Sequence, residues 1–216
     1  MRILLVGATK FEIAPLLKKF KKISSAGKIS SYHFGNHFID VLITDPGIAN
    51  TSFYLGKKLS KKYDLAINAG IAGSFRKNIQ PGTVVNVVED CFSDFGAEDR
   101  NIFFTAEEIG LVKKTRLKNK SFRNRLLASL PKIKAITVNT VHGNETSIKK
   151  VVKKFNPDIE SMEGAAFFLA CQTEKNLCLQ IRAISNYVEK RNKRNWKINL
   201  AVLNLSHFLE SFLSSI

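Results

Sequence analysis

The stretch "RILLVGATKFEIAPLLKKF", residues 2 to 20, contains two hydrophobic periodicities in immediate succession. Residues 3 to 6 form a continuous apolar run that Gly7 ends, which is typical of a buried strand. Apolar residues then recur at the spacing of one helix face, at Ile13, Leu16, Leu17 and Phe20. Pro15 fits such a helix only within its first turn. The stretch therefore predicts a strand followed directly by a helix, with Glu12 at the junction.

The same alternation continues along the chain. Apolar runs predict further strands at residues 38–44, 65–68, 84–88 and 177–181. Helical patterns occupy residues 50–62, 105–115 and 120–130, a segment opening at Ser147, and residues 162–171 and 198–212. No repeat or low-complexity stretch interrupts this order. We expect an α/β layer fold in a single domain, residues 1–216.

Composition is that of an ordinary globular protein, with 216 residues of which 44% are hydrophobic and 24% charged. The apolar run behind Arg2 is too short for a signal peptide or a membrane span, so we expect a cytoplasmic protein without membrane contact. Cys91, Cys171 and Cys178 are odd in number and lack C-x-x-C spacing. Buried free thiols are therefore expected, rather than a disulfide or a zinc site.

The formal net charge of +16 raises the question of nucleic-acid binding. The lysines, however, occur as scattered pairs on the polar sides of helical patterns, as in "LLKKF" and "IKKVVKKF". No zinc-finger spacing, RNP-like strand or helix-turn-helix signature accompanies them. We expect solvated helix faces and no nucleic-acid partner, with the charge helping to attract an anionic substrate.

Polar residues and glycines follow several predicted strands. Ligands of such sheets bind beyond the carboxyl ends of the strands, so these positions are the first candidates for a site. They are Glu12, "DPGIAN" (45–50), "AGIAGSF" (69–75), "EDCFSDFGAED" (89–99), and Arg182, Ser185 and Asn186. Neither a dinucleotide fingerprint nor a Walker A sequence is present, which disfavours nicotinamide and ATP enzymes.

Four motifs carry a family resemblance: "GATKFEI" (7–13), "NAGIAGSF" (68–75), "ESMEGAAFF" (160–168) and "IRAISN" (181–186). In this order they resemble the nucleoside phosphorylase/nucleosidase superfamily, which includes methylthioadenosine/S-adenosylhomocysteine nucleosidases. The resemblance covers nearly the whole chain and implies a three-layer fold in which helices flank a central mixed β-sheet. "DCFSDFGAED" (90–99) and "RAISNYVEKRNKRNWKINLA" (182–201) are similar to futalosine hydrolases of the alternative menaquinone pathway.

The resemblance implies roles for charged residues in cleaving a ribosyl N-glycosidic bond. Such cleavage passes through an oxocarbenium-like state, with negative charge growing on the purine. Glu12 would be the base that deprotonates water, although a carboxylate at a helix start has a structural explanation as well. Glu163 would bind the ribose hydroxyls and Met162 would pack on the ribose, unless Met162 is plain core. Arg182 would hold the glutamates and the water, or form a structural ion pair, or both.

Further positions are assigned by the same resemblance. Asn186 stands where adenine-specific relatives have Asp, and its amide can donate to O6 of hypoxanthine and accept from a protonated N7. Asn cannot supply that proton, so water must bring it; the structural alternative is an Asn that caps a turn. Ser185 binds near the purine or closes the strand. The substrate-binding set also contains Gly47, Gly70, Ile71, Ala72 and Phe92.

Two other groups stay outside the assigned set. His142 lies in the loop "NTVHGNE" (139–145), where relatives contact the base, but a lone loop histidine is more often exposed. Glu160 is offset by one position from the first glutamate of related nucleosidases.

Ile71 stands where methylthioadenosine nucleosidases have a serine that helps to bind the attacking water. The resemblance therefore does not assign a second residue that binds this water. The carboxyphenyl group of futalosine implies a nearby cation, for which Arg76, Lys190 and Arg191 are candidates.

We thus expect a nucleosidase that cleaves futalosine with water, releasing hypoxanthine and dehypoxanthine futalosine, with no metal or organic cofactor. The alternatives are an adenine-releasing nucleosidase acting on aminodeoxyfutalosine, methylthioadenosine or S-adenosylhomocysteine, a purine nucleoside phosphorylase, and a non-catalytic nucleoside-binding protein. Phosphorylases of the superfamily have a phosphate-binding G-D-P-x-R motif after the first strand. This chain has "GATKFEI" there, whose carboxylate would repel phosphate, so hydrolysis is expected. A homo-oligomer is expected, because a neighbouring subunit often completes the pocket in this superfamily.

Overall fold

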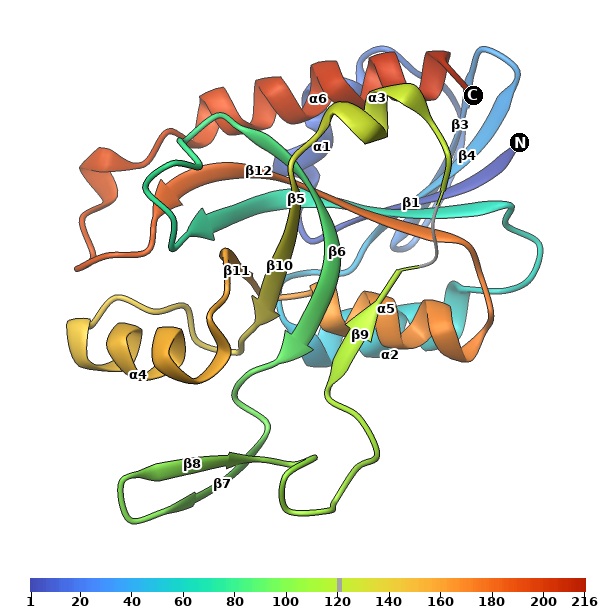
Figure 1. Cartoon of the computed structure of the whole chain (residues 1–216). Coiled ribbons are helices and arrows are strands. Elements are labelled where there is room, and N and C mark those ends of the chain that lie inside the picture. Colours follow the sequence, from blue (N-terminus) through green and yellow to red (C-terminus); the bar gives the residue numbers. More distant parts are fainter. Residues whose placement is uncertain (120–121) are drawn as a thin grey trace.

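The computed structural model describes residues 1–119 and 122–216. Within them a ten-stranded sheet has the spatial order β11-β10-β6-β12-β5-β1-β4-β3-β2, with β9 beside β6 (Figure 1). Its strands are β1 (Arg2–Gly7), β2 (Lys21–Ala26), β3 (Ile29–Phe34), β4 (His37–Ile43), β5 (Leu65–Ser74), β6 (Val84–Phe92), β9 (Arg116–Lys118), β10 (Lys132–Thr137), β11 (Ile159–Ser161) and β12 (Cys178–Tyr187). A separate hairpin is formed by β7 (Gly96–Asp99) and β8 (Ile102–Thr105).

The sheet is mixed, and β5 is its central strand. β1 and β12 run parallel to β5 on either side, whereas β6 runs antiparallel to β12. β11 pairs with β10 and also with the end of β5, so β5, β12, β6, β10 and β11 close into a ring. This closure brings the end of β5 beside β11 and the helix that follows it.

Helices cover both faces of the sheet (Figure 1). They are α1 (Lys10–Leu17), α2 (Ile48–Lys58), α3 (Arg125–Ser129), α4 (Glu145–Phe155), α5 (Gly164–Thr173) and α6 (Ile198–Ser214). α1 and α6 pack on one face over a core that contains Ile13, Leu205 and Phe212, whereas α2 and α5 pack on the other over Leu55 and Phe167. The predicted α/β fold with a central mixed sheet flanked by helices is confirmed.

Several predicted boundaries are wrong. Residues 69 to 74, expected as a glycine loop, continue β5. β12 extends beyond the apolar run 177–181 and contains Arg182, with Ser185 and Asn186 near its end, as expected. These segments stay extended because β5 and β12 pair with each other along their length, with a register shift between Ile184 and Asn186. Residues 89 to 92 likewise belong to β6.

The helix predicted at residues 105–115 is also wrong. Thr105 and Glu108 do form the hydrogen bonds of a helix start, since the Glu108 carboxylate accepts from the Thr105 amide and hydroxyl. Gly110, with a φ of 74°, then ends the turn. Of the helix predicted at 120–130, Lys120 and Ser121 lie outside the described residues, and only α3 is helical. Pro15 lies in the second turn of α1, not its first, and Phe20 lies beyond its end.

Two further findings concern the cysteines and the length of the helices. Cys91, Cys171 and Cys178 are buried and free, as predicted. In the described part of the chain, no helix combines the length and apolarity needed to cross a membrane.

Candidate functional site

Most of the predicted site residues line one cavity of about 210 Å³, here called the glutamate cavity. It opens where the ends of β1, β5 and β12 meet the start of α5. Its lining residues are Ala8, Thr9, Glu12, Pro46, Ile71, Ala72, Gly73, Val141, His142, Glu160, Ser161, Met162, Glu163, Ser185, Asn186, Arg191 and Trp196. A larger hollow of about 670 Å³ beside α3 has no carboxylate in its lining.

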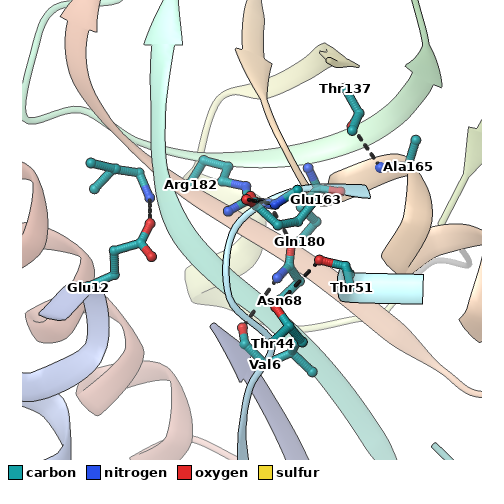
Figure 2. A network of polar contacts seen from close by, with 12 residues as sticks. Val6, Glu12, Thr44, Thr51, Asn68, Thr137, Glu163, Ala165, Gln180 and Arg182 are labelled. Atoms are coloured by element: carbon teal, nitrogen blue, oxygen red, sulfur yellow. Dashed lines mark hydrogen bonds and ion pairs between the residues drawn. The ribbon is translucent and has the colours of Figure 1, made fainter. Parts of the chain in front are cut away.

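Glu12 is held at the start of α1 by hydrogen bonds to both carboxylate oxygens. Oε2 accepts from the backbone nitrogen of Thr9 at 3.0 Å and from its hydroxyl at 2.9 Å, which forms a capping box. Oε1 accepts from the backbone nitrogen of Ile71 at 3.0 Å (Figure 2). Glu12 therefore both caps α1 and lines the cavity, where it is 7% exposed.

Glu163 stands at the N-cap of α5, directly after Met162. Its Oε1 accepts from the backbone nitrogen of Gly47 at 3.3 Å, and its Oε2 lies 3.5 Å from Nη2 of Arg182. Gly47 caps α2 with a φ of 104°, a conformation that favours glycine. Burial raises the pKa of Glu163 above its usual value although Arg182 opposes the shift, and the nearby Glu12 charge raises it further.

Arg182 is 0% exposed and is the largest fully buried side chain of the residues that the structure describes. Nη2 donates to Oδ1 of Asn68, whose amide in turn donates to the carbonyl of Val6 at 3.2 Å (Figure 2). Nε and Nη1 have no partner among the described residues. A Cβ at Gly70 would lie 2.3 Å from Nη1 and 2.9 Å from Oε1 of Glu12. Gly70 is therefore required because the Arg182 guanidinium and the Glu12 carboxylate both lie where a Cβ at this position would stand.

A second polar network supports the first turn of α5. Asp90 is fully buried; it accepts from Thr137 Oγ1 and from Gln180 Nε2, each at 2.9 Å. Thr137 Oγ1 also accepts from the backbone nitrogen of Ala165. A Cβ at Gly164 would lie 2.1 Å from Asp90 Oδ2, so only glycine fits there. Burial raises the pKa of Asp90 to about 6, against these hydrogen bonds and the Arg182 charge.

Asn186 and Ser185 lie side by side at the end of β12. The Ser185 hydroxyl donates to Oδ1 of Asn186 at 2.7 Å, and its oxygen also lies 3.2 Å from the carbonyl of Ala72. Nδ2 of Asn186 donates to the carbonyl of Tyr187 at 2.9 Å. One amide hydrogen and one lone pair of Oδ1 remain for a ligand, since a side-chain amide carries two of each.

His142 and Glu160, which sequence reasoning left outside the site, form a hydrogen-bonded pair within the glutamate cavity. His142 Nδ1 lies 2.6 Å from Glu160 Oε2, and the His142 backbone nitrogen donates to Oε1 at 3.0 Å. Their side chains are only 16% and 4% exposed. Sequence reasoning missed the pair because β11, which carries Glu160, was not predicted. The sequence gives little signal for this strand, because Ile159 stands alone between Asp158 and Glu160.

Other predicted residues lie elsewhere. Phe92 packs at the edge of the core under α5 and does not line the cavity, and Gly47 acts through Glu163. Arg76 pairs with Asp158, and Lys190 is exposed and does not line the cavity. Arg191 does line it, with its guanidinium 5.3 Å from the centre of the Trp196 ring. Among the described residues, no group of three or more His, Cys, Asp or Glu side chains could hold a metal ion.

Comparison of the sequence with known proteins identifies a family and several relatives. The model of the "Phosphorylase superfamily" matches residues 2–214. A 5'-methylthioadenosine/S-adenosylhomocysteine nucleosidase of Buchnera aphidicola is 29% identical, over 95% of this chain and 86% of that protein. A futalosine hydrolase of Streptomyces coelicolor is 28% identical, over 68% of this chain and 63% of its own length.

The fold has solved counterparts. The structure of futalosine hydrolase from Helicobacter pylori superposes with a TM-score of 0.83 over 100% of this chain and 98% of that one, at 18% identity. At that level of identity the similarity concerns the fold alone.

Proposed function

The chain belongs to the phosphorylase superfamily, and from this premise we propose that it is a purine nucleosidase whose substrate is futalosine, which it cleaves with water to hypoxanthine and dehypoxanthine futalosine. The observation that carries the proposal is the convergence of Glu12 and Glu163 on one cavity, with Arg182 behind them. Two carboxylates suit a reaction whose transition state carries positive charge on the sugar.

In the proposed reaction Glu12 accepts a proton from the attacking water. Both carboxylate oxygens already accept backbone or hydroxyl hydrogen bonds, which hold the carboxylate in a fixed position for this role. Ile71 contributes through its backbone nitrogen, and this contribution does not depend on its side chain. Nη1 of Arg182, close to Glu12 over Gly70, offers a donor for the water oxygen.

Glu163 is proposed to accept hydrogen bonds from the ribose hydroxyls. The carboxylate is oriented by Gly47 and Arg182 before substrate arrives, so little reorganisation is needed on binding. Met162 lines the same wall and offers an apolar surface to the sugar. The network of Asp90, Gln180 and Thr137 fixes the start of α5 and thereby the position of Glu163.

Two features favour futalosine, the first over its 6-amino analogue and the second over nucleosides that lack the carboxyphenyl group, such as methylthioadenosine. Asn186 keeps a free amide hydrogen, which can donate to O6 of hypoxanthine, and an ionised Asp at this position would repel that oxygen. Arg191, stacked on Trp196 at the cavity, offers a guanidinium to the substrate carboxylate and an adjacent ring to its phenyl group. An adenine-releasing nucleosidase is the second candidate, because the glutamate pair would serve either base.

Hydrolysis is preferred to phosphorolysis, because a phosphate near the reacting carbon would face the carboxylates of Glu12 and Glu163. The cavity of about 210 Å³ is also smaller than the roughly 300–1,000 Å³ usual for ligand pockets. We accordingly propose a homo-oligomer in which a second copy of the chain encloses the rest of the substrate.

The test incubates purified protein with futalosine, aminodeoxyfutalosine and methylthioadenosine in phosphate-free buffer, and identifies the released base by chromatography. We expect free hypoxanthine from futalosine at the highest kcat/KM of the three. A strict requirement for phosphate would assign the chain to the phosphorylases, and a preference for methylthioadenosine to the adenine-releasing enzymes. Glu12→Gln protein serves as the control for contaminating nucleosidases.

A further inference from the structure

Departure of the purine requires a proton that Asn186 cannot supply. In the proposed reaction, electrons of the C1'–N9 bond move onto the base, and protonation at N7 neutralises the charge that develops there. The amide of Asn186 can stabilise this charge by a hydrogen bond but has no acidic proton to transfer. A separate group in the cavity must therefore transfer the proton, unless water does so.

The His142–Glu160 pair has the chemistry of such a group. Glu160 in its ionised form only accepts hydrogen bonds, so the contact at 2.6 Å places a proton on Nδ1 of His142. Nε2 is then the ring nitrogen that exchanges a proton with a ligand. No hydrogen bond to Nε2 is present in residues 1–119 and 122–216. An edge contact with Phe75, at 6.2 Å between ring centroids, further fixes the ring.

The pair also lies beside Asn186, the residue proposed to bind the base. Gly73 is the register partner of Asn186 in β12 and of Glu160 in β11. A Cβ at Gly73 would lie 3.4 Å from Asn186 Nδ2 and 3.7 Å from Glu160 Cγ. The two side chains therefore flank one glycine, and all three residues line the glutamate cavity together with His142.

A purely structural role explains this arrangement less well. The backbone nitrogen of His142 already donates to Glu160 Oε1, which fixes the loop to β11 without the imidazole. A buried carboxylate needs a partner, but the ring that provides it also lines the cavity. The other charged groups that share a cavity wall with His142 are Arg191, Glu12, Glu163 and Asp94.

We propose that His142, oriented by Glu160, is the general acid that protonates the leaving purine. The imidazolium transfers its Nε2 proton to N7 as the C1'–N9 bond breaks, and its electron pair returns to the ring. Water forms the new bond to C1' and gives its proton to Glu12, so that one water is consumed for each base released. Solvent then restores the proton to His142 and removes that of Glu12. This inference rests on the proposed nucleosidase function.

The test compares His142→Gln with the parent on two substrates. One is futalosine, and the other is futalosine methylated at N7 of the hypoxanthine, whose base is already positively charged and needs no proton. We expect the variant to lose about 10²-fold or more in kcat on futalosine, and less than about threefold on the methylated analogue. The fall of kcat on the alkaline side of the pH profile should also disappear for His142→Gln.

His207→Gln provides the matched control, because His207 is exposed on α6 and does not line the cavity. Equal losses on the two substrates, or no loss on either, would overturn the role of His142 while leaving the nucleosidase function in place. A parent protein that releases no base from any purine nucleoside would overturn the proposed function and this assignment together. Glu160→Gln should show the same substrate dependence to a smaller extent.

Discussion

Arg182 and Glu163 form an ion pair almost completely closed off from solvent, with 3.5 Å between Nη2 and Oε2. Burial nevertheless raises the pKa of Glu163, because desolvation outweighs the attraction of a guanidinium that also donates to Asn68. Each carboxylate oxygen keeps a lone pair for ligand hydroxyls, because Gly47 contacts one oxygen and Arg182 the other. Loss of either partner is expected to destabilise the protein, because the remaining charge would be buried without water or a counter-ion.

Removal of Arg182 should therefore destabilise the fold. Arg182→Met is expected to lower the free energy of unfolding by about 3 to 5 kcal/mol at pH 8, where Glu163 would be left as an unpaired buried charge. Denaturant unfolding followed by circular dichroism gives the value. The double variant Arg182→Met/Glu163→Gln should recover at least half of the loss. A double variant no more stable than the single one would mean that cavity formation, not charge, dominates.

Asp90 should make stability depend on pH. Its pKa of about 6 in the folded protein lies above the usual 3.8, so the folded state holds the proton more tightly than the unfolded state. The contribution of Asp90 to the free energy of unfolding is therefore fully present below about pH 4. About 3 kcal/mol of it is lost as the pH rises through 6. Asp90→Asn should flatten this part of the profile, measured by denaturant unfolding between pH 4 and 7. Parallel profiles for parent and variant would contradict the assignment.

Glu12→Gln tests the proposed base. The amide keeps the size of the side chain and can still accept the hydrogen bond of Ile71, but it cannot take a proton from water. We expect kcat to fall by about 10²-fold or more with little change in substrate binding. Steady-state kinetics with calorimetric titration of an inert analogue separates the two quantities. Turnover within twofold of the parent would exclude Glu12 as the base.

Asn186→Asp tests how the base is bound. A carboxylate would face O6 of hypoxanthine but could accept from the 6-amino group of adenine, so the ratio of kcat/KM for futalosine over aminodeoxyfutalosine should fall by about tenfold or more. Competition between the two substrates in one reaction measures this ratio directly. An unchanged ratio would indicate that Asn186 only closes the end of β12.

Arg191→Gln tests binding of the substrate carboxylate. Loss of one charged hydrogen-bond partner costs about 1.5 to 3 kcal/mol, so KM for futalosine should rise roughly tenfold or more while kinetics with neutral methylthioadenosine stay within about twofold. Lys190→Gln removes the same charge from an exposed neighbour outside the cavity and serves as the control. A similar effect of both variants would point to the overall positive charge instead.

The sequence alone determined the α/β class and the position of Glu12, because local periodicity predicts which face of an element is buried, and a capping box needs only neighbours in the chain. Its motifs also indicated Glu163, Arg182 and Asn186. Lys132 and Lys134 alternate with Ile133 and Ala135 in β10, which is the pattern of a strand, but this strand was not predicted.

Only the tertiary structure decided how the site is assembled. Gly70 and Gly73 predict a loop by composition, yet both lie in β5, where the absence of a Cβ leaves room for Arg182 at Gly70 and for Val188 at Gly73. His142 and Glu160 are 18 residues apart and meet because β10, which leads to the loop of His142, pairs with β11. Strand pairing depends on free energy shared among distant segments, and no local pattern of side chains records it.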